Sequence, residues 1–232
     1  MSVLYPLAHL SLFLLEWILL GLAIRLWLKS NSVAMIVLPI LLASLSYDNC
    51  LLAGGRLVGE GELLLFLSKL RFLLHYLTVP MFVVVGVELA HRAGAAWATT
   101  LTRTLSWLTA LGLAWVDIAI NYLGLQLVPV DAWGVLRYQV AVLNGPPIIT
   151  IIVNVFVLLI GIGLYIRLRW QWLLVGTVVA LVGNSIPSSV VGTLPGSASE
   201  FVLAISLLLT ENRTQSVGLS LPLNQALREE VI

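Results

Sequence analysis

The sequence predicts an all-α integral membrane protein, a bundle of about seven transmembrane helices. Of its 232 residues, 60% are hydrophobic and only 10% are charged, whereas soluble domains carry roughly 25% charged residues. Apolar runs of about 20 residues, the length that crosses a bilayer, follow one another with short polar breaks. The loops between these runs also differ in their content of Lys and Arg, as in membrane proteins with a fixed orientation.

The predicted spans cover most of the chain. They are residues 7–28, 33–53, 70–90, 105–125, 147–166, 172–191 and 198–210. The last run is the shortest, so six spans with one interfacial helix is the alternative. We therefore predict a single transmembrane domain over residues 1–210 and a polar cytoplasmic tail over residues 211–232.

The basic residues predict the orientation. Eight Lys and Arg residues follow the odd-numbered spans and four follow the even-numbered spans. Because cytoplasmic loops carry the excess of positive charge, we expect the N-terminus outside and the C-terminus in the cytoplasm. The expected location is the cell (plasma) membrane, with a thylakoid or other internal membrane as the alternative.

A short motif occurs twice in the sequence. Residues 70–80 and 136–146 both follow the pattern L-R-[FY]-x4-L-x2-P, and the copies are expected to open the third and fifth spans. A duplication would place Arg71 on Arg137 and Pro80 on Pro146 when the second and third spans are superposed on the fourth and fifth. A chance match between apolar sequences is the alternative.

Polar side chains within the spans concentrate on one side of the membrane, the outer side in the predicted orientation. Ionisable residues there cost several kcal/mol unless they are paired or solvated. Arg71 and His75 are four residues apart and share a helix face, as do Asp117 and Asn121. We therefore predict an outward-facing polar pocket. Its predicted ligand-binding residues are Glu16, Asp48, Asn49, Arg71, His75, Asp117, Asn121 and Asn184, with His9, Asn144 and Glu200 at a similar depth.

Specific pairs follow from the chemistry of these groups. Arg71 is always charged, so its burial requires a carboxylate, and Asp48 on the preceding span is the expected partner. His75 is the expected proton-exchanging group because imidazole titrates near neutral pH. Asp117 is then expected to pair with His75 or to bind a ligand. At the inner end, Glu88 and Arg92 are four apart and are expected to pair.

Three functions are compatible with this pattern. The first is the binding or transport of a small molecule or lipid in the pocket. The second is an enzyme acting on a lipid or isoprenoid, with His75 as the general acid or base and Asp48 or Asp117 orienting it. The third is a structural or assembly role, in which polar side chains only hydrogen-bond helix to helix.

Other classes of site and partner are not indicated. The net charge of +1 gives no basic surface for nucleic acid. The sequence has neither an H-x3-H nor an HExxH motif, nor a phosphate-binding loop, so we expect no metal and no cofactor. The expected partner is the lipid bilayer, and the sequence does not predict an oligomeric state.

Overall fold

The computed structural model describes residues 3–30, 32–141 and 147–229, with the side chains of Ser189 and of residues 217–229 left out. The described part is mostly helical, and six of its helices are long and apolar enough to cross a membrane. This is the architecture of a helical integral membrane protein, as the composition predicts.

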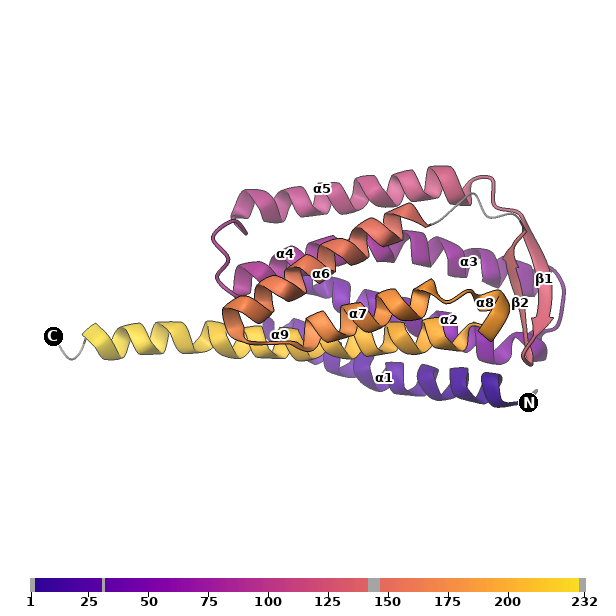
Figure 1. Cartoon of the computed structure of the whole chain (residues 1–232), viewed down its shortest axis with the longest axis horizontal. Helices are drawn as coiled ribbons and strands as arrows, with labels where there is room; N and C mark the ends of the chain where they lie inside the picture. The colour runs from indigo at the N-terminus through magenta and orange to yellow at the C-terminus, as the bar shows by residue number, and fades with distance from the viewer. Residues whose placement is uncertain (1–2, 31, 142–146, 230–232) are drawn as a thin grey trace.

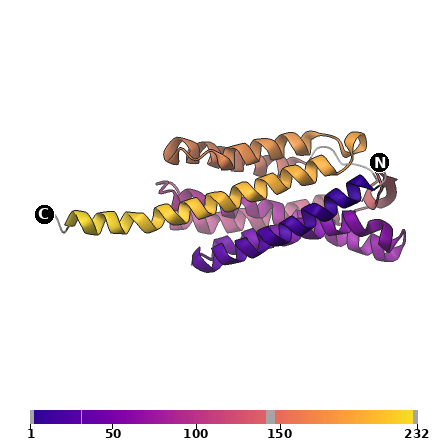
Figure 2. The same cartoon turned by 90° about the horizontal axis from the view of Figure 1, so that it is seen from below.

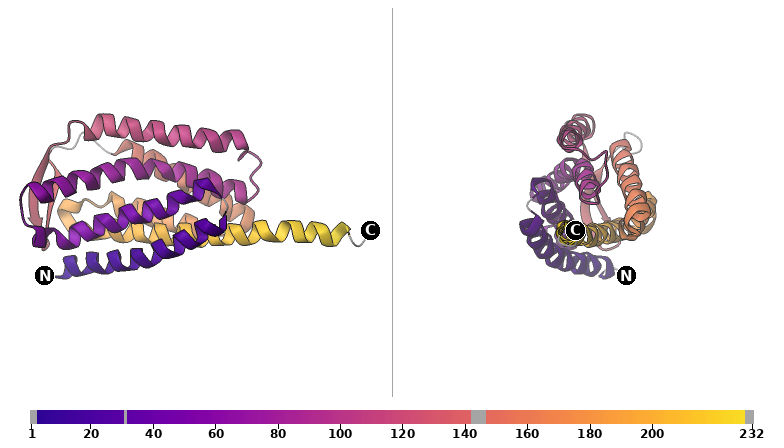
Figure 3. Two further views of the ribbon diagram at one scale, coloured as in Figure 1. Left: turned by 180° about the vertical axis from the view of Figure 1, so that it is seen from behind. Right: turned by 90° about the vertical axis from the view of Figure 1, so that its left-hand side faces the viewer.

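The helices lie side by side along the long axis of the molecule (Figure 1). The first half of the chain contains α1 (Leu4–Ser30), a 3-10 turn (Val33–Ile36), α2 (Val37–Val58), α3 (Glu62–Thr78), a second 3-10 turn (Val79–Met81), α4 (Phe82–Arg92), α5 (Thr100–Asp117) and a π-helical turn (Ile118–Tyr122). The second half contains α6 (Ile148–Leu168), α7 (Trp172–Ser185), α8 (Ser188–Val191) and α9 (Leu194–Glu229). The N-terminal half of α9 packs between α7 and α1, and its C-terminal part extends beyond the bundle (Figures 2 and 3).

Apolar side chains cover both the inside and the outside of this bundle. Met35 and Leu89 are fully buried in the main core, whereas Leu14, Trp17 and Leu159 are more than half exposed. A soluble protein rarely exposes so many large apolar side chains together. A hydrocarbon environment removes that cost, so the exposed apolar surface agrees with burial in lipid.

The pair α7 and α9 is packed through small residues. A Cβ atom added at Gly176 would overlap the side chain of Ser206, and one added at Gly183 would overlap that of Ser199. Close backbone approach through small residues is typical of helix pairs in membranes. The absence of side chains at these two glycines therefore sets the distance between the helices.

The lengths of the last two apolar helices differ from the prediction. The final span is Leu194–Ser216, 23 residues long, whereas the preceding helix α7 has only 14 residues, or about 21 Å at the α-helical rise. The apolar run predicted over residues 198–210 is therefore the middle of a longer helix, and α7 is the short one. The Ser and Thr residues of the final span are accommodated because their hydroxyls bond to carbonyls one turn earlier, as Ser206 does to Val202 and Thr210 does to Ser206.

A β-hairpin closes one end of the bundle, where the all-α prediction has no strand. Strands β1 (Leu127–Ala132) and β2 (Val135–Val140) pair antiparallel. They are joined by Trp133 and Gly134, both with positive φ (58° and 82°), as in the type I′ turns that match the twist of a hairpin. Trp133 stacks on Tyr5 of α1 with ring centroids 5.4 Å apart, so the hairpin and the N-terminus lie together (Figure 3).

The predicted internal repeat is wrong. Arg71 lies in helix α3, whereas Arg137 lies in strand β2. The second copy follows a tight turn and alternates apolar and polar residues, with the β-formers Tyr138 and Val140 two residues apart, which favours a strand over a helix. The remaining motif positions of that copy, Leu143 and Pro146, lie outside the described residues.

Candidate functional site

A cavity of about 520 Å³ lies toward the hairpin end of the bundle. This is within the usual range for small-molecule sites, about 300–1,000 Å³. Residues of every helix from α2 to α9 line it, together with Val140 of β2 and residues of the irregular segments between the helices. Six of the predicted ligand-binding residues belong to this lining. They are Asp48, Arg71, His75, Asp117, Asn121 and Asn184.

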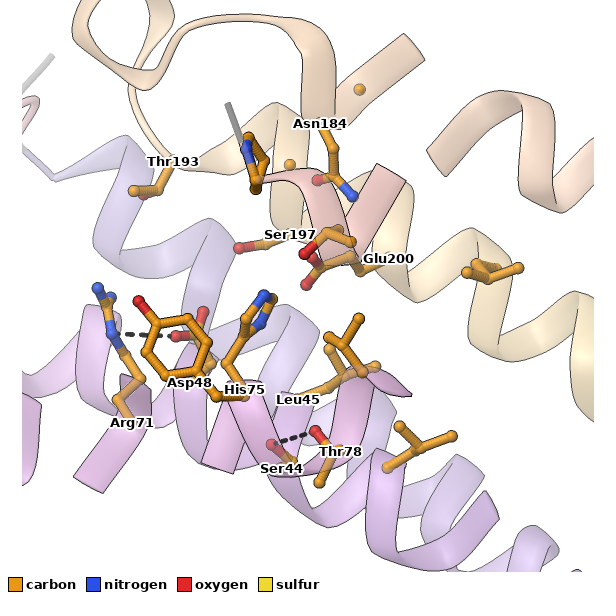
Figure 4. Close-up of a pocket in the computed structure, with 18 of the residues that line it drawn as sticks. Ser44, Leu45, Asp48, Arg71, His75, Thr78, Asn184, Thr193, Ser197 and Glu200 are labelled. Carbon is orange, nitrogen blue, oxygen red and sulfur yellow. Dashed lines mark hydrogen bonds and ion pairs between the residues drawn. The ribbon is translucent and has the colours of Figure 1, made fainter. Parts of the chain in front are cut away.

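Arg71 and Asp48 form the ion pair that the sequence predicts. Arg71 Nε lies 3.3 Å from Asp48 Oδ1 (Figure 4), and the two side chains are 12% and 30% exposed. Arg137 of the hairpin, which is buried but does not line the cavity, adds a second positive charge near this pair. Burial, and then the charge of Arg71, lower the pKa of Arg137 below its ordinary value, while Asp48 opposes this effect.

His75 and Glu200 approach one another across the cavity from α3 and α9 (Figure 4). No described residue forms a hydrogen bond with the His75 imidazole, and its nearest aromatic neighbour is Tyr76, edge-on at 6.1 Å. Asp48 pairs with Arg71, and Asp117 Oδ1 accepts a 2.6 Å hydrogen bond from Asn121. Neither candidate carboxylate is therefore bonded to His75.

Among the described residues, Glu200 is the charged lining residue that the predicted ligand-binding set omits. Its side chain faces the cavity near Asn184 of α7 (Figure 4). The sequence does contain a signal for Glu200. It is an acidic residue at the start of an apolar run, and its predicted depth in the membrane is the same as that of the other residues in the set. Asn144, also predicted at this depth, lies outside the described residues.

The rest of the lining is largely aliphatic. Leucines on one face of α2, spaced three or four residues apart, are joined by apolar residues of α9. They include Leu38, Leu41, Leu45, Leu203, Ala204 and Leu207. The cavity is therefore amphipathic, with charged groups toward the hairpin and hydrocarbon along the helices.

Three departures from regular α-helix border the cavity. They are the 3-10 turn at Val79–Met81, the π-helical turn at Ile118–Tyr122, and the break after Ser185, where Ile186 and Pro187 are extended. Proline explains the last, because the residue before it is driven out of the helical region. Irregular helical backbone in membrane proteins is tolerated where it is buried in protein or lines a cavity, and π-turns occur often at functional sites.

Glu16 and Asn49 form a separate buried network beside the cavity and do not line it. Asn49 Nδ2 donates to Glu16 Oε1 at 2.9 Å, and Asn49 Oδ1 lies 2.7 Å from His9 Nδ1. The other ring nitrogen of His9 lies 2.8 Å from the Thr193 hydroxyl, which does line the cavity. These bonds join α1 to α2 and to the start of α9, as expected for polar contacts between helices.

The opposite end of the bundle is closed by a second charged network. Glu88 accepts hydrogen bonds from Arg92 at 3.2 Å and Arg103 at 2.8 Å, and Arg92 Nη1 lies 2.7 Å from Glu211 Oε1. The expected pairing of Glu88 with Arg92 is confirmed, and the network extends it to α5 and α9. Glu211 is fully buried, so the packed part of α9 continues past residue 210, where the predicted tail begins.

The described residues contain no group of three His, Cys, Asp or Glu side chains placed to hold a metal ion. No known family profile, curated protein or solved structure matches this chain. The geometry of the cavity is therefore the basis for inferring its function.

Proposed function

We propose that this protein binds a small amphipathic molecule or a lipid in the cavity and moves it into or across the membrane. The observation that carries the proposal is the division of the lining into a charged end and an aliphatic wall. A ligand with a polar group and an apolar body would satisfy both surfaces, since sites of this kind combine apolar walls with a few placed polar groups.

The backbone supports transport in addition to binding. The helix α7 stops beside the cavity at Ser185, and the chain then passes through α8 before α9 begins. Transporters commonly form their sites at interrupted helices, whose ends can move around a bound ligand. The charged network around Glu88 and Arg92 holds the other end of the bundle together.

The proposed orientation places the cavity toward the outside and the C-terminal tail in the cytoplasm of a cell membrane. Supporting this, the residues Arg92, Arg103 and Arg167 gather at the end of the bundle opposite the hairpin, on α4, α5 and α6. Those helix ends would face the cytoplasm under the positive-inside rule.

The other two functions have weaker support. An enzyme using His75 as its acid or base would be expected to orient the imidazole through a carboxylate, and no such hydrogen bond is present among the described residues. A purely structural role accounts for Glu16 and Asn49, which are paired between helices. It does not account for a cavity into which Glu200 and His75 project.

A thermal-stability screen of amphiphiles in lipid nanodiscs tests the proposal. A ligand should raise the melting temperature of the wild type in a saturable manner. Leu45→Trp, which adds bulk inside the cavity, should abolish the shift, and Leu14→Trp, on the lipid-facing side of α1, should preserve it. Equal responses of both variants would contradict binding in the cavity.

A further inference from the structure

We propose that the ligand carries a cationic group, such as a protonated or quaternary amine, on an aliphatic body. This inference rests on the proposed function and specifies the chemical class of the ligand. It follows from the balance of charges around the cavity, from the positions of the uncompensated carboxylates and from the apolar wall beside them.

The arginine that lines the cavity is already engaged in an ion pair. Among the charged residues that line the cavity, Arg71 is the single Lys or Arg within the described part of the chain, and it pairs with Asp48. Arg137 lies outside the lining and adds further positive charge on the same side, near Asp48. A carboxylate ligand would have to share Arg71 with Asp48, and it would add a fourth acidic group to a lining that already holds Asp48, Asp117 and Glu200.

Two other carboxyl groups lack such compensation. Within the described residues, neither Glu200 nor Asp117 forms an ion pair with a basic side chain. Asp117 is 4% exposed, and within the part of the chain that the structure describes its side chain accepts a hydrogen bond only from the Asn121 amide. Ionised carboxylates in a low-dielectric site are costly unless an opposite charge is supplied, and a cationic ligand would supply it.

The remaining lining fits the rest of such a molecule. Tyr76 lies beside His75 and also lines the cavity, and the face of a phenol ring attracts ammonium groups. The aliphatic wall formed by α2 and α9 leads away from this charged end. An alkyl chain placed there would be removed from water while its ammonium group lay near Glu200.

Four ten-carbon probes with one tail and different head groups test the inference. They are decylamine, decyltrimethylammonium, decanol and decanoate, titrated against the full-length protein in nanodiscs with empty nanodiscs subtracted. Both cations should bind about ten- to a hundredfold more tightly than decanol, as expected for hydrogen bonds and ion pairs to a charged group, and decanoate should bind least.

Variants then assign the preference to the carboxylates. Glu200→Gln should reduce the affinity for both cations about tenfold or more while leaving the affinity for decanol unchanged, and that retained binding shows that the fold survives. If Glu200→Gln does not fold, Asp117→Asn serves in its place with the same expectation. Glu62→Gln, which removes an exposed carboxylate at the same end of the bundle, is the matched control and should behave as wild type.

The outcomes separate the two levels of the proposal. Saturable binding of decanol, equal to that of the cations, would overturn the cationic class and leave binding in the cavity intact. Tighter binding of decanoate, or cation binding that Glu200→Gln and Asp117→Asn both leave unchanged, would also overturn it. Absence of saturable binding by all four probes would overturn the proposed function as well.

Discussion

At the scale of single residues, Arg71 depends on Asp48 for its burial. The guanidinium is 12% exposed, and the structure gives it one carboxylate partner among the described residues. We predict that Asp48→Ala lowers the free energy of unfolding by about 1.5–3 kcal/mol, the range for hydrogen bonds to charged groups. Unfolding in mixed detergent micelles measures this change.

The exposed pair of Arg56 with Asp131 provides a control for that measurement. Its side chains are 46% and 50% exposed, and exposed ion pairs contribute about 0–1 kcal/mol. Asp131→Ala should therefore have a smaller effect than Asp48→Ala. Equal losses from the two substitutions would mean that the cavity solvates Arg71 without help from Asp48.

Asn49 is predicted to be structural. Its amide is the link between His9 and Glu16, and all three residues are buried. Asn49→Ala should lower the free energy of unfolding by about 1–3 kcal/mol, the cost of leaving buried polar groups unpaired. Ser11→Ala, which removes an exposed hydroxyl bonded only to its own helix, should be close to neutral, and a neutral Asn49→Ala would contradict the role assigned to the network.

Sequence reasoning identified the pair of Asp48 with Arg71 because a permanently charged side chain needs a counter-charge on the neighbouring span. It did not separate Asn49 from Asp48, which are adjacent in the chain and at the same depth. Only the rotation of α2 decides that Asp48 faces the cavity and Asn49 faces α1. That rotation is set by packing against several helices and cannot be derived from spacing within one.

At the scale of elements, the hairpin depends on a close approach to α2. A Cβ at Gly55 would overlap the carbonyl oxygen of Leu136, whereas a Cβ at Gly54 would meet nothing within 4 Å. We predict that Gly55→Ala displaces the hairpin and increases hydrogen exchange across residues 127–140. Gly54→Ala should leave exchange unchanged, because alanine is the better helix former and no neighbour obstructs it.

A result in which both glycine variants exchange like the wild type would show that the hairpin does not depend on this contact. The hairpin is not among the predicted elements because its residues lie between two predicted spans, and part of it matches the motif expected to open the fifth span. Its signals were the Trp133–Gly134 turn and the alternation in β2, and they are weaker than the long apolar runs on either side. The short α7 was missed for a related reason, since apolar composition continues through residues that Pro187 excludes from the helix.

At the scale of the whole molecule, the orientation is the prediction with the widest consequences. A reporter inserted after Gly59 and one fused after Ile232 should lie on opposite sides of the membrane, with the C-terminal reporter in the cytoplasm, because basic residues gather at the end opposite the hairpin. A C-terminal reporter outside would place the cavity on the cytoplasmic side.

The fold class can be predicted from the apolar composition and from the length of the apolar runs, because any chain that crosses a bilayer must have both. The position of the cavity follows from how the helices α2 to α9 pack together, and from three local departures from α-helix. These features depend on contacts between distant residues. The position of a residue within its predicted span gives its depth in the membrane. These depths place Asp48, Arg71, His75 and Asp117 on one side of the membrane, but they do not show that the four residues share one cavity.

The central claim is that a ligand occupies this cavity. Photolabelling with a decylamine that carries a diazirine in its alkyl chain, followed by peptide mapping, tests it most directly. The account predicts saturable labelling of lining residues such as Leu45 and Leu203, competed by unlabelled decylamine. Labelling confined to lipid-facing residues such as Leu14 and Trp17, and unaffected by competitor, would contradict it.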